Sequence, residues 1–599
     1  MEESYWNTDY WHSMDRSRGK EDIININPSQ IGISHGIGDP LQGLKSNIFV
    51  GASQVELGFM GQGKGFRSQP TGWTPESVSR PEREAIKQLA KINEVQLSTH
   101  ATPNVAISGI GEQGFSEDQR ERALFEVKKA IDFAADTAEG GPVVLHAQEF
   151  PRPLFEKYKE QGFLQYPEEE EKAPAQLVDT SSGRVIPLRR DTRVAIPKGG
   201  WDTPKRKDDG TVEFEVKSLN DLYKESLKKG EKKVFAEFYT DYLRKDLDLN
   251  KGEERRWAID AKDHEKEANE IQGMIKSIEK QAQQYPKEAK YSAIQLAEQS
   301  KLAPSKGSSG YQEFLQNPLD YIKKAEHKLR DRASSLYQIS QSYGSKYEEA
   351  KDQFERIKPI EDYGIKQSSE AVARAAMYGY NLEKSRNLER PITIVPENWT
   401  PEVYGGHPEE LKKLVQESRR AMTDQLVKEK HIDKEQAKKI AQEHIKATFD
   451  IGHLNMWRKY FQGSDKEFKQ WVDMQVQDLL KNNIIGHVHI TDNFGYHDEH
   501  LTPGEGTAPI KEFLQRLETQ DYKGTIVAEP GGQPEGKIFQ SMTGAWGLSN
   551  YSMYRLDGMS RSWSDIEGSY FGKTEGPRFV VGDFAPSKDW TLWSEVPLE

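Results

Sequence analysis

Eight short apolar runs, rich in β-branched residues and separated by longer segments, constrain the fold of this 599-residue chain most strongly. Helical patterns lie between most of the runs. Alternating strands and helices predict a parallel sheet covered by helices, and eight is the number of strands that closes a (β/α)8 barrel. We therefore expect an α/β protein built on a TIM barrel, with an open doubly wound sheet as the alternative. The runs lie at 31–35, 54–59, 95–100, 142–147, 391–397, 447–453, 487–491 and 525–530.

A large insertion is expected after the fourth strand, because the fourth and fifth runs are much farther apart than the others. This segment, 155–362, is predicted to be mainly helical. Ile271, Met274, Ile275 and Ile278 have the spacing of one helix face. We expect two or three long antiparallel helices, with the Ser/Gly-rich segment 302–310 as one connection. The other expected parts are an N-terminal extension (1–30), a first barrel part (31–154), a second barrel part with most metal ligands (363–545) and an aromatic-rich extension packed on the barrel (546–599).

Composition excludes several classes of site. The chain has no cysteine, so any metal must be held by His, Asp and Glu. No run of 18 apolar residues is present, which argues against a membrane span. The N-terminus lacks the apolar region of a secretory signal, so we expect a cytoplasmic protein. A formal net charge of −13 argues against indiscriminate coating of nucleic acid.

Acidic and imidazole side chains gather at the carboxyl ends of six consecutive predicted strands. In a TIM barrel these ends converge on one face, where active sites are built. Imidazoles mixed with carboxylates suit a cation such as Zn²⁺ or Mn²⁺. The sequence therefore predicts a metal site formed by residues among His100, His146, Glu397, Asp450, His453, His487, His489, Asp498, His500 and Glu529.

Three stretches carry a resemblance to a known family. They are FDIGH (449–453), HITDNFGYHDEHLTPGEG (489–506) and IVAEP (526–530). With them the chain resembles the xylose isomerase-like TIM barrels, and within these the AP endonuclease family 2, or endonuclease IV, branch. The resemblance covers about 31–150 and 365–545, and leaves out the insertion and the C-terminal extension.

The resemblance implies up to three zinc ions and nine ligand side chains. One ion would take His100, His146 and Glu397. A second would share Glu397 and add Asp450, His489 and Glu529, and a third would take His453, Asp498 and His500. His487 points to the same side of its strand as His489. The family's H-x-x-D spacing favours His489 as the ligand, which leaves His487 as a neighbour of the site.

Two enzymatic functions are compatible with this ligand set. The first is endonuclease IV-like hydrolysis of DNA phosphodiester bonds at abasic sites, with Glu397, Glu529, Asp450 and His453 as catalytic residues. The second is a sugar or sugar-phosphate isomerase or epimerase, which needs only Glu397, Asp450, His489 and Glu529 around Mn²⁺, Mg²⁺ or Co²⁺. In that case His453 would contact the substrate. The complete set of nine favours the nuclease, whereas Pro103 occupies the place where the nuclease family often has a tyrosine.

Further expectations concern binding. His35, Lys64, Arg67, Trp73 and His487 are weaker candidates for substrate contacts. The partner would be DNA with abasic sites or a small sugar, and the helical insertion could mediate self-association. A third hypothesis is a scaffold protein that retains the barrel while the insertion binds a partner. The intact ligand set argues against it.

Overall fold

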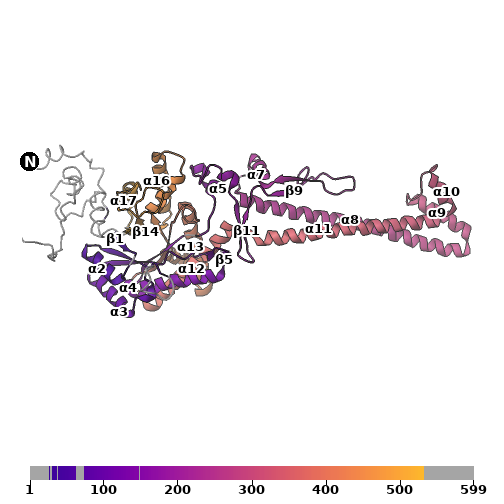
Figure 1. Ribbon diagram of the computed structural model, residues 1–599. Coiled ribbons are helices and arrows are strands. Elements are labelled where there is room, and N and C mark those ends of the chain that lie inside the picture. The colour runs from indigo at the N-terminus through magenta and orange to yellow at the C-terminus, as the bar shows by residue number, and fades with distance from the viewer. Residues whose placement is uncertain are drawn as a thin grey trace, which may run out of the picture. The chain divides into compact units, whose positions relative to one another are not determined.

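Eight parallel strands close into a barrel within the part of the chain that the structure describes (Figure 1). The computed structural model describes residues 26, 30–36, 38–61, 73–147, 149–231, 233–529 and 531. Each predicted run supplies one strand, so the TIM barrel is confirmed and the open sheet is wrong. In their order around the barrel the strands are β1 (Ile31–His35), β15 (Thr525–Ala528), β14 (Ile485–Ile490), β13 (Ala447–Asp450), β12 (Ile392–Glu397), β6 (Gly141–His146), β3 (Gln96–His100) and β2 (Gln54–Gly58).

Helices alternate with these strands, and capping boxes fix where several of them begin. The Ser79 backbone N–H donates to Glu82 Oε2 over 2.7 Å, and Ser464 pairs with Glu467 in the same way over 2.8 Å. The helices of the barrel unit are α2 (Pro40–Phe49), η3 (Pro75–Ser77), α3 (Arg80–Ile92), α4 (Glu117–Ala138), α5 (Phe155–Tyr158), η4 (Lys159–Gln161), α6 (Glu169–Lys172), α12 (Ile360–Arg386), α13 (Pro408–Lys430), α14 (Lys434–His444), α15 (Ile451–Asn455), η5 (Met456–Tyr460), α16 (Asp465–Lys481) and α17 (Ile510–Thr519). A short hairpin, β4 (Ile110–Gly111) and β5 (Gly114–Phe115), precedes α4.

Strand alternation separates the core from the site. Val488 and Ile490 of β14 belong to the apolar cluster that the strands form with the surrounding helices. His487 and His489 lie on the other face of the same strand, which is the inside of the barrel. The period of two therefore directs imidazoles inward and apolar side chains outward.

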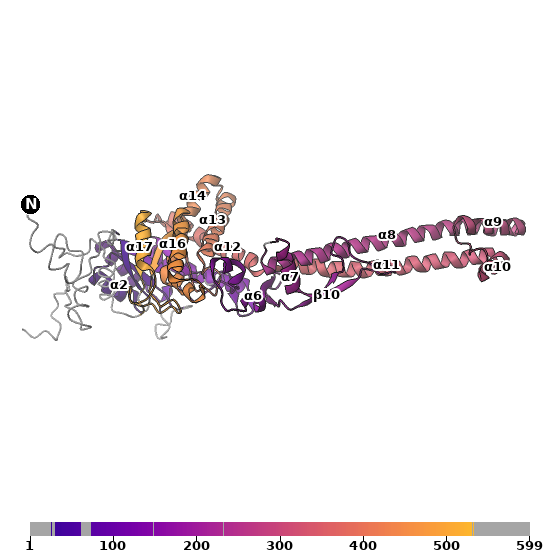
Figure 2. The same cartoon turned by 90° about the horizontal axis from the view of Figure 1, so that it is seen from above.

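Most of the insertion after β6 forms a second compact unit, comprising Leu177–Ser181 and Pro187–Pro359, whereas its first part, 155–176, belongs to the barrel unit. Its two long helices, α8 (Phe235–Gln284) and α11 (Pro318–Arg356), lie side by side (Figure 2). The large helical insertion after the fourth strand is thus confirmed. Its other elements are α7 (Leu219–Lys228), α9 (Pro286–Gln299), α10 (Ser309–Gln316), β9 (Arg193–Pro197), β10 (Phe214–Ser218) and β11 (Ile357–Pro359), and two strands, β7 (Ala175–Asp179) and β8 (Val185–Leu188), cross the boundary with the barrel unit.

The predicted apolar face of α8 is largely buried. Ile271, Ile275 and Ile278 pack with Ile322 of α11, but Met274 is 49% exposed. The entry and exit of the insertion are paired, because Leu177–Asp179 and Ile357–Pro359 form an antiparallel ladder. Among the described helices, none is both long and apolar enough to cross a membrane. The predicted C-terminal extension and almost all of the N-terminal extension lie outside the described residues.

Candidate metal centre

The nine side chains that the resemblance singles out lie in three groups at the carboxyl ends of the strands. In each group the ligand-type atoms all lie within 4.8 Å of one another. The grouping corresponds to the one that the resemblance implies, and metal binding by these residues stays a prediction. The groups are His100, His146 and Glu397; then Glu397, Asp450, His489 and Glu529; and finally His453, Asp498 and His500.

Glu397 lies between the first two groups and is fully buried. Its Oε2 lies 3.3 Å from His100 Nε2 and 3.6 Å from His146 Nε2. Its Oε1 lies 2.9 Å from His489 Nδ1. Because its two oxygens face different imidazoles, this one carboxylate can contribute to two cation positions.

Three of the imidazoles share one orientation. In His100, His453 and His500, Nδ1 lies 2.7, 2.9 and 3.1 Å respectively from a backbone carbonyl oxygen. A carbonyl only accepts, so Nδ1–H donates, and in the neutral ring Nε2 then carries the lone pair. This tautomer is typical of metal-ligating histidines.

Local hydrogen bonds place Asp450 and His453. Asp450 ends β13 and caps α15, because its Oδ1 accepts the His453 backbone N–H over 2.8 Å. Thr491 Oγ1 donates to the same oxygen over 2.7 Å. Gly452 permits this close approach of helix and strand, since a Cβ there would come within 1.9 Å of Thr491 Oγ1.

The loop after β14 brings Asp498 and His500 to the third group. Buried Asp492 accepts backbone N–H groups from Gly504 and Gly506 over 2.8 and 2.9 Å. The H-x-x-D motif therefore has a folding role through its aspartate. His500 Nε2 lies 2.9 Å from Asp498 Oδ2, and His453 Nε2 lies 3.4 Å from that oxygen.

Burial and mutual charge shift the pKa values of these groups. Burial raises the pKa of Glu529 to about 7. Burial alone would raise the pKa of Glu397, but His489 and the other imidazoles hold it well below its usual range. Burial would lower the pKa of His500, yet Asp498 raises it to about 9. A carboxylate thus favours positive charge on the imidazole beside it, which is the charge that a bound cation would supply.

The donor set fits divalent cations. Several buried ligand-type atoms have no hydrogen-bond partner among the described residues: His146 Nδ1, Asp450 Oδ2, His453 Nε2 and Asp498 Oδ1. Buried polar atoms normally have partners, so such atoms in one cluster indicate a ligand. Imidazole nitrogens and carboxylate oxygens are ligands of Zn²⁺ and, with less imidazole, of Mn²⁺.

The weaker sequence candidates that the structure describes lie outside these groups. His487 is buried beside His489, with ring centroids 4.9 Å apart. The His35 ring lies against Gly43 of α2. Trp73 packs at the edge of the apolar cluster that contains Phe59. Lys64 and Arg67 lie outside the described residues.

Sequence reasoning missed two residues next to the metal centre. Trp399, half-buried, stacks on His146 with centroids 3.9 Å apart and meets the edge of His453 at 4.7 Å. Glu56 of β2 is fully buried and forms a further ligand-type group with His100, His489 and Glu529. An acidic residue inside the apolar run QVELGF was the available signal for Glu56.

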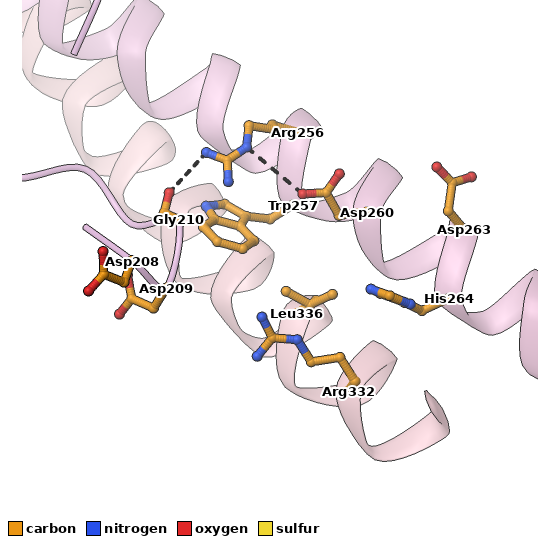
Figure 3. Close-up of a pocket in the computed structure, with 10 residues that line it drawn as sticks. All are labelled: Asp208, Asp209, Gly210, Arg256, Trp257, Asp260, Asp263, His264, Arg332 and Leu336. Carbon is orange, nitrogen blue, oxygen red and sulfur yellow. Dashed lines mark hydrogen bonds and ion pairs between the residues drawn. The ribbon is translucent and has the colours of Figure 1, made fainter. Parts of the chain in front are cut away.

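A separate cavity of about 390 Å³ lies within the helical unit (Figure 3). Arg256 there donates to the Gly210 carbonyl oxygen over 3.1 Å and lies 3.9 Å from Asp260. The residues that line this cavity carry charges of both signs. Within the described ranges, the side-chain groups that could hold a cation lie in the barrel, so the metal centre is the stronger candidate site.

Comparison with known proteins agrees with the barrel assignment. Residues 428–543 match the protein family described as "Xylose isomerase-like TIM barrel". The resemblance found in the sequence is therefore confirmed over these residues, which form about a fifth of the chain. "Uncharacterized protein MJ1311" of Methanocaldococcus jannaschii is 39% identical over 94 residues, which are 15% of this chain and 28% of that protein. The aligned part thus spans little more than a quarter of the relative.

Solved structures similar to this chain include two epimerase-type proteins. A D-tagatose 3-epimerase-like protein is 14% identical, with 86% of this chain and 96% of that chain covered and a TM-score of 0.34. D-psicose 3-epimerase with D-tagatose, from Clostridium cellulolyticum H10, is 8% identical, with 85% and 89% covered and a TM-score of 0.33. At these scores the assignment of the fold depends on the strand order of the barrel itself.

Proposed function

We propose that this protein is a metal-dependent hydrolase that cleaves phosphodiester bonds of DNA at abasic sites. The observation that carries the proposal is the third ligand group, His453, Asp498 and His500. A sugar isomerase needs only the group around Glu397 and Glu529, whereas a three-cation hydrolase needs all three. All nine positions carry the residue types that the resemblance to endonuclease IV implies, which adds support.

The residues divide the work in this proposal. Glu397 would bridge two cation positions, since its two oxygens face different imidazoles. His453 and His500 would present Nε2 to a third position, held by their Nδ1 bonds to carbonyl oxygens. When bound, divalent cations would supply Lewis acidity toward a water molecule and the phosphate oxygens. Trp399 offers an aromatic face for the sugar or base beside the cleaved bond.

A second candidate, a sugar isomerase or epimerase, is favoured by one specific observation. Burial raises the pKa of Glu529 to about 7. A carboxyl group that titrates near neutrality suits proton transfer between adjacent carbons of a sugar. Glu397 would be the second proton-transfer carboxylate, on the opposite side of the substrate from Glu529.

The decisive experiment combines metal content with two activity assays. Protein purified without added metal is analysed by mass spectrometry, then assayed on a duplex with one abasic site and on ketose and aldose substrates. Close to three zinc ions per chain with cleavage 5′ to the lesion would support the hydrolase. One or two ions with sugar turnover and no cleavage would replace it with the isomerase. Glu397→Gln should abolish either activity, and retained turnover would refute the site.

A further inference from the structure

Glu56 is a buried carboxylate of β2 that faces two histidines of β14 across the inside of the barrel. Its Oε1 lies 3.0 Å from His489 Nε2, and its Oε2 lies 3.5 Å from His487 Nε2. Ser98 Oγ donates to Oε2 over 3.0 Å, which fixes the carboxylate from the neighbouring strand. No solvent reaches Glu56 or either imidazole, since all three are 0% exposed.

His489 differs in orientation from His100, His453 and His500. Those three rings direct Nδ1 to a backbone carbonyl oxygen and Nε2 to the ligand groups. His489 instead directs Nδ1 to Glu397 Oε1, at 2.9 Å, and to Glu529 Oε1, at 3.5 Å. Its Nε2 therefore lies on the other side of the ring from these two carboxylates, 3.0 Å from Glu56 Oε1. In His489 the nitrogen that faces away from Glu397 and Glu529 thus lies near the Glu56 carboxylate. In the other three rings the corresponding nitrogen lies near a backbone carbonyl oxygen.

We propose that Glu56 is a positioning residue that holds His489 as the Nε2–H tautomer, so that Nδ1 is available to a cation. The proposal rests on the proposed metal site but not on the identity of the substrate. A neutral imidazole has one N–H, and the group that accepts it decides which nitrogen keeps the lone pair. A carboxylate acceptor also makes the ligating nitrogen more basic, and loss of such a partner typically lowers metal affinity about 10- to 100-fold.

The competing role for Glu56 is that of a ligand. Its carboxylate, His100, His489 and Glu529 lie close enough to share a cation. The two roles predict different results. Loss of a positioning residue weakens binding at the second group and leaves the number of sites unchanged. Loss of a ligand removes one cation from the stoichiometry.

The test uses the full-length protein and the variants Glu56→Gln, Glu56→Leu and Ser98→Ala. Cation stoichiometry is measured by mass spectrometry, Zn²⁺ affinity by chelator competition, and ligand geometry by the visible spectrum of the Co²⁺-loaded protein. Glu149→Gln is the matched control, because Glu149 is a buried carboxylate of the same unit outside the ligand groups.

In Glu56→Gln the amide oxygen can still accept a hydrogen bond from Nε2–H, so we expect the wild-type stoichiometry, a nearly unchanged Co²⁺ spectrum and about a tenfold loss of affinity. Glu56→Leu should lose about 100-fold and alter the spectrum, and Ser98→Ala should lose less than either. Wild-type affinity in Glu56→Leu, one cation fewer in Glu56→Gln, or no cation binding by the wild-type protein would overturn the proposal. Cation binding without DNA cleavage would refute only the proposed function.

Discussion

Asn398 and Asp450 exchange two hydrogen bonds across the ends of neighbouring strands. Asn398 Nδ2 donates to the Asp450 carbonyl oxygen over 2.9 Å, and the Asp450 backbone N–H donates to Asn398 Oδ1 over 2.8 Å. Both residues are fully buried. This side chain thus fixes the ends of β12 and β13, which carry Glu397 and Asp450.

Asn398→Ala should lower the free energy of unfolding by about 2–4 kcal/mol, because two buried backbone groups lose their partners. Zn²⁺ affinity should fall as well, since the strand ends are no longer held in register. Urea denaturation and chelator competition measure the two effects. Asn482→Ala, which changes an exposed asparagine at the end of α16, is the control and should alter neither quantity appreciably. Wild-type stability in Asn398→Ala would show that these hydrogen bonds are not needed.

Asp498→Ala separates the two proposed functions. The change removes a carboxylate from the third ligand group, so a three-cation hydrolase should lose one cation and about 100-fold or more in cleavage rate. An isomerase that uses the group around Glu397 and Glu529 should lose little. Metal analysis and the two activity assays check this, with Glu499→Ala, at the adjacent exposed position, as the control. Unchanged cleavage with three cations would remove Asp498 from the ligand set.

Much of this centre was predictable, and the reason is geometric. Strand-end position and side-chain alternation indicated His100, Glu397, Asp450 and His489, because these follow from local periodicity. The link between Glu56 and His489 joins strands that are far apart in sequence and not neighbours in the barrel, so no local pattern contains it. The stacking of Trp399 on His146 depends likewise on a contact between the loop after β12 and the end of β6.

The helical unit shows the same limit. Spacing predicted the buried isoleucines of α8 but also included Met274, which lies at the edge of the stripe and is exposed. Which edge of an apolar stripe is buried depends on where the partner helix packs. The sequence pattern shows how many neighbouring positions of a helix are apolar. The packing of the partner helix decides which of these positions are buried.

Stability should decrease as the pH rises through the titration of Glu149. Burial raises the pKa of this carboxyl from 4.5 to about 7. The folded protein therefore binds the proton more tightly than the unfolded chain, and the stabilisation present below pH 4.5 is lost by about pH 7, up to about 3 kcal/mol. Glu149→Gln should flatten this part of the profile of unfolding free energy against pH. If unfolding free energy depended on pH in the same way in Glu149→Gln and in the wild-type protein, the raised pKa of Glu149 would be contradicted.

Ile275→Asp should unfold part of the helical unit without emptying the metal centre. Ile275 is buried between α8 and its neighbours, and a charge there should cost about 3 kcal/mol or more. Circular dichroism should report lost helicity, while zinc content stays at the wild-type value. Met274→Asp, at the adjacent exposed position, should leave helicity intact. Loss of zinc in Ile275→Asp would show that the two units depend on each other for folding.

The pairing of β7 with β11 has a consequence for the order of events during synthesis. His146 and Glu397 are Cα partners in adjacent strands, yet the ribosome makes the whole insertion between them. The first strands of the barrel therefore have an unpaired edge until β12 is made. Such an edge can pair with another chain and cause aggregation. The individual helices of the insertion form quickly from local contacts, and once its ends are paired the loop that β6 and β12 must close is shorter. The predicted cation ligands come together last, because Glu529 follows β15, the strand that closes the barrel against β1.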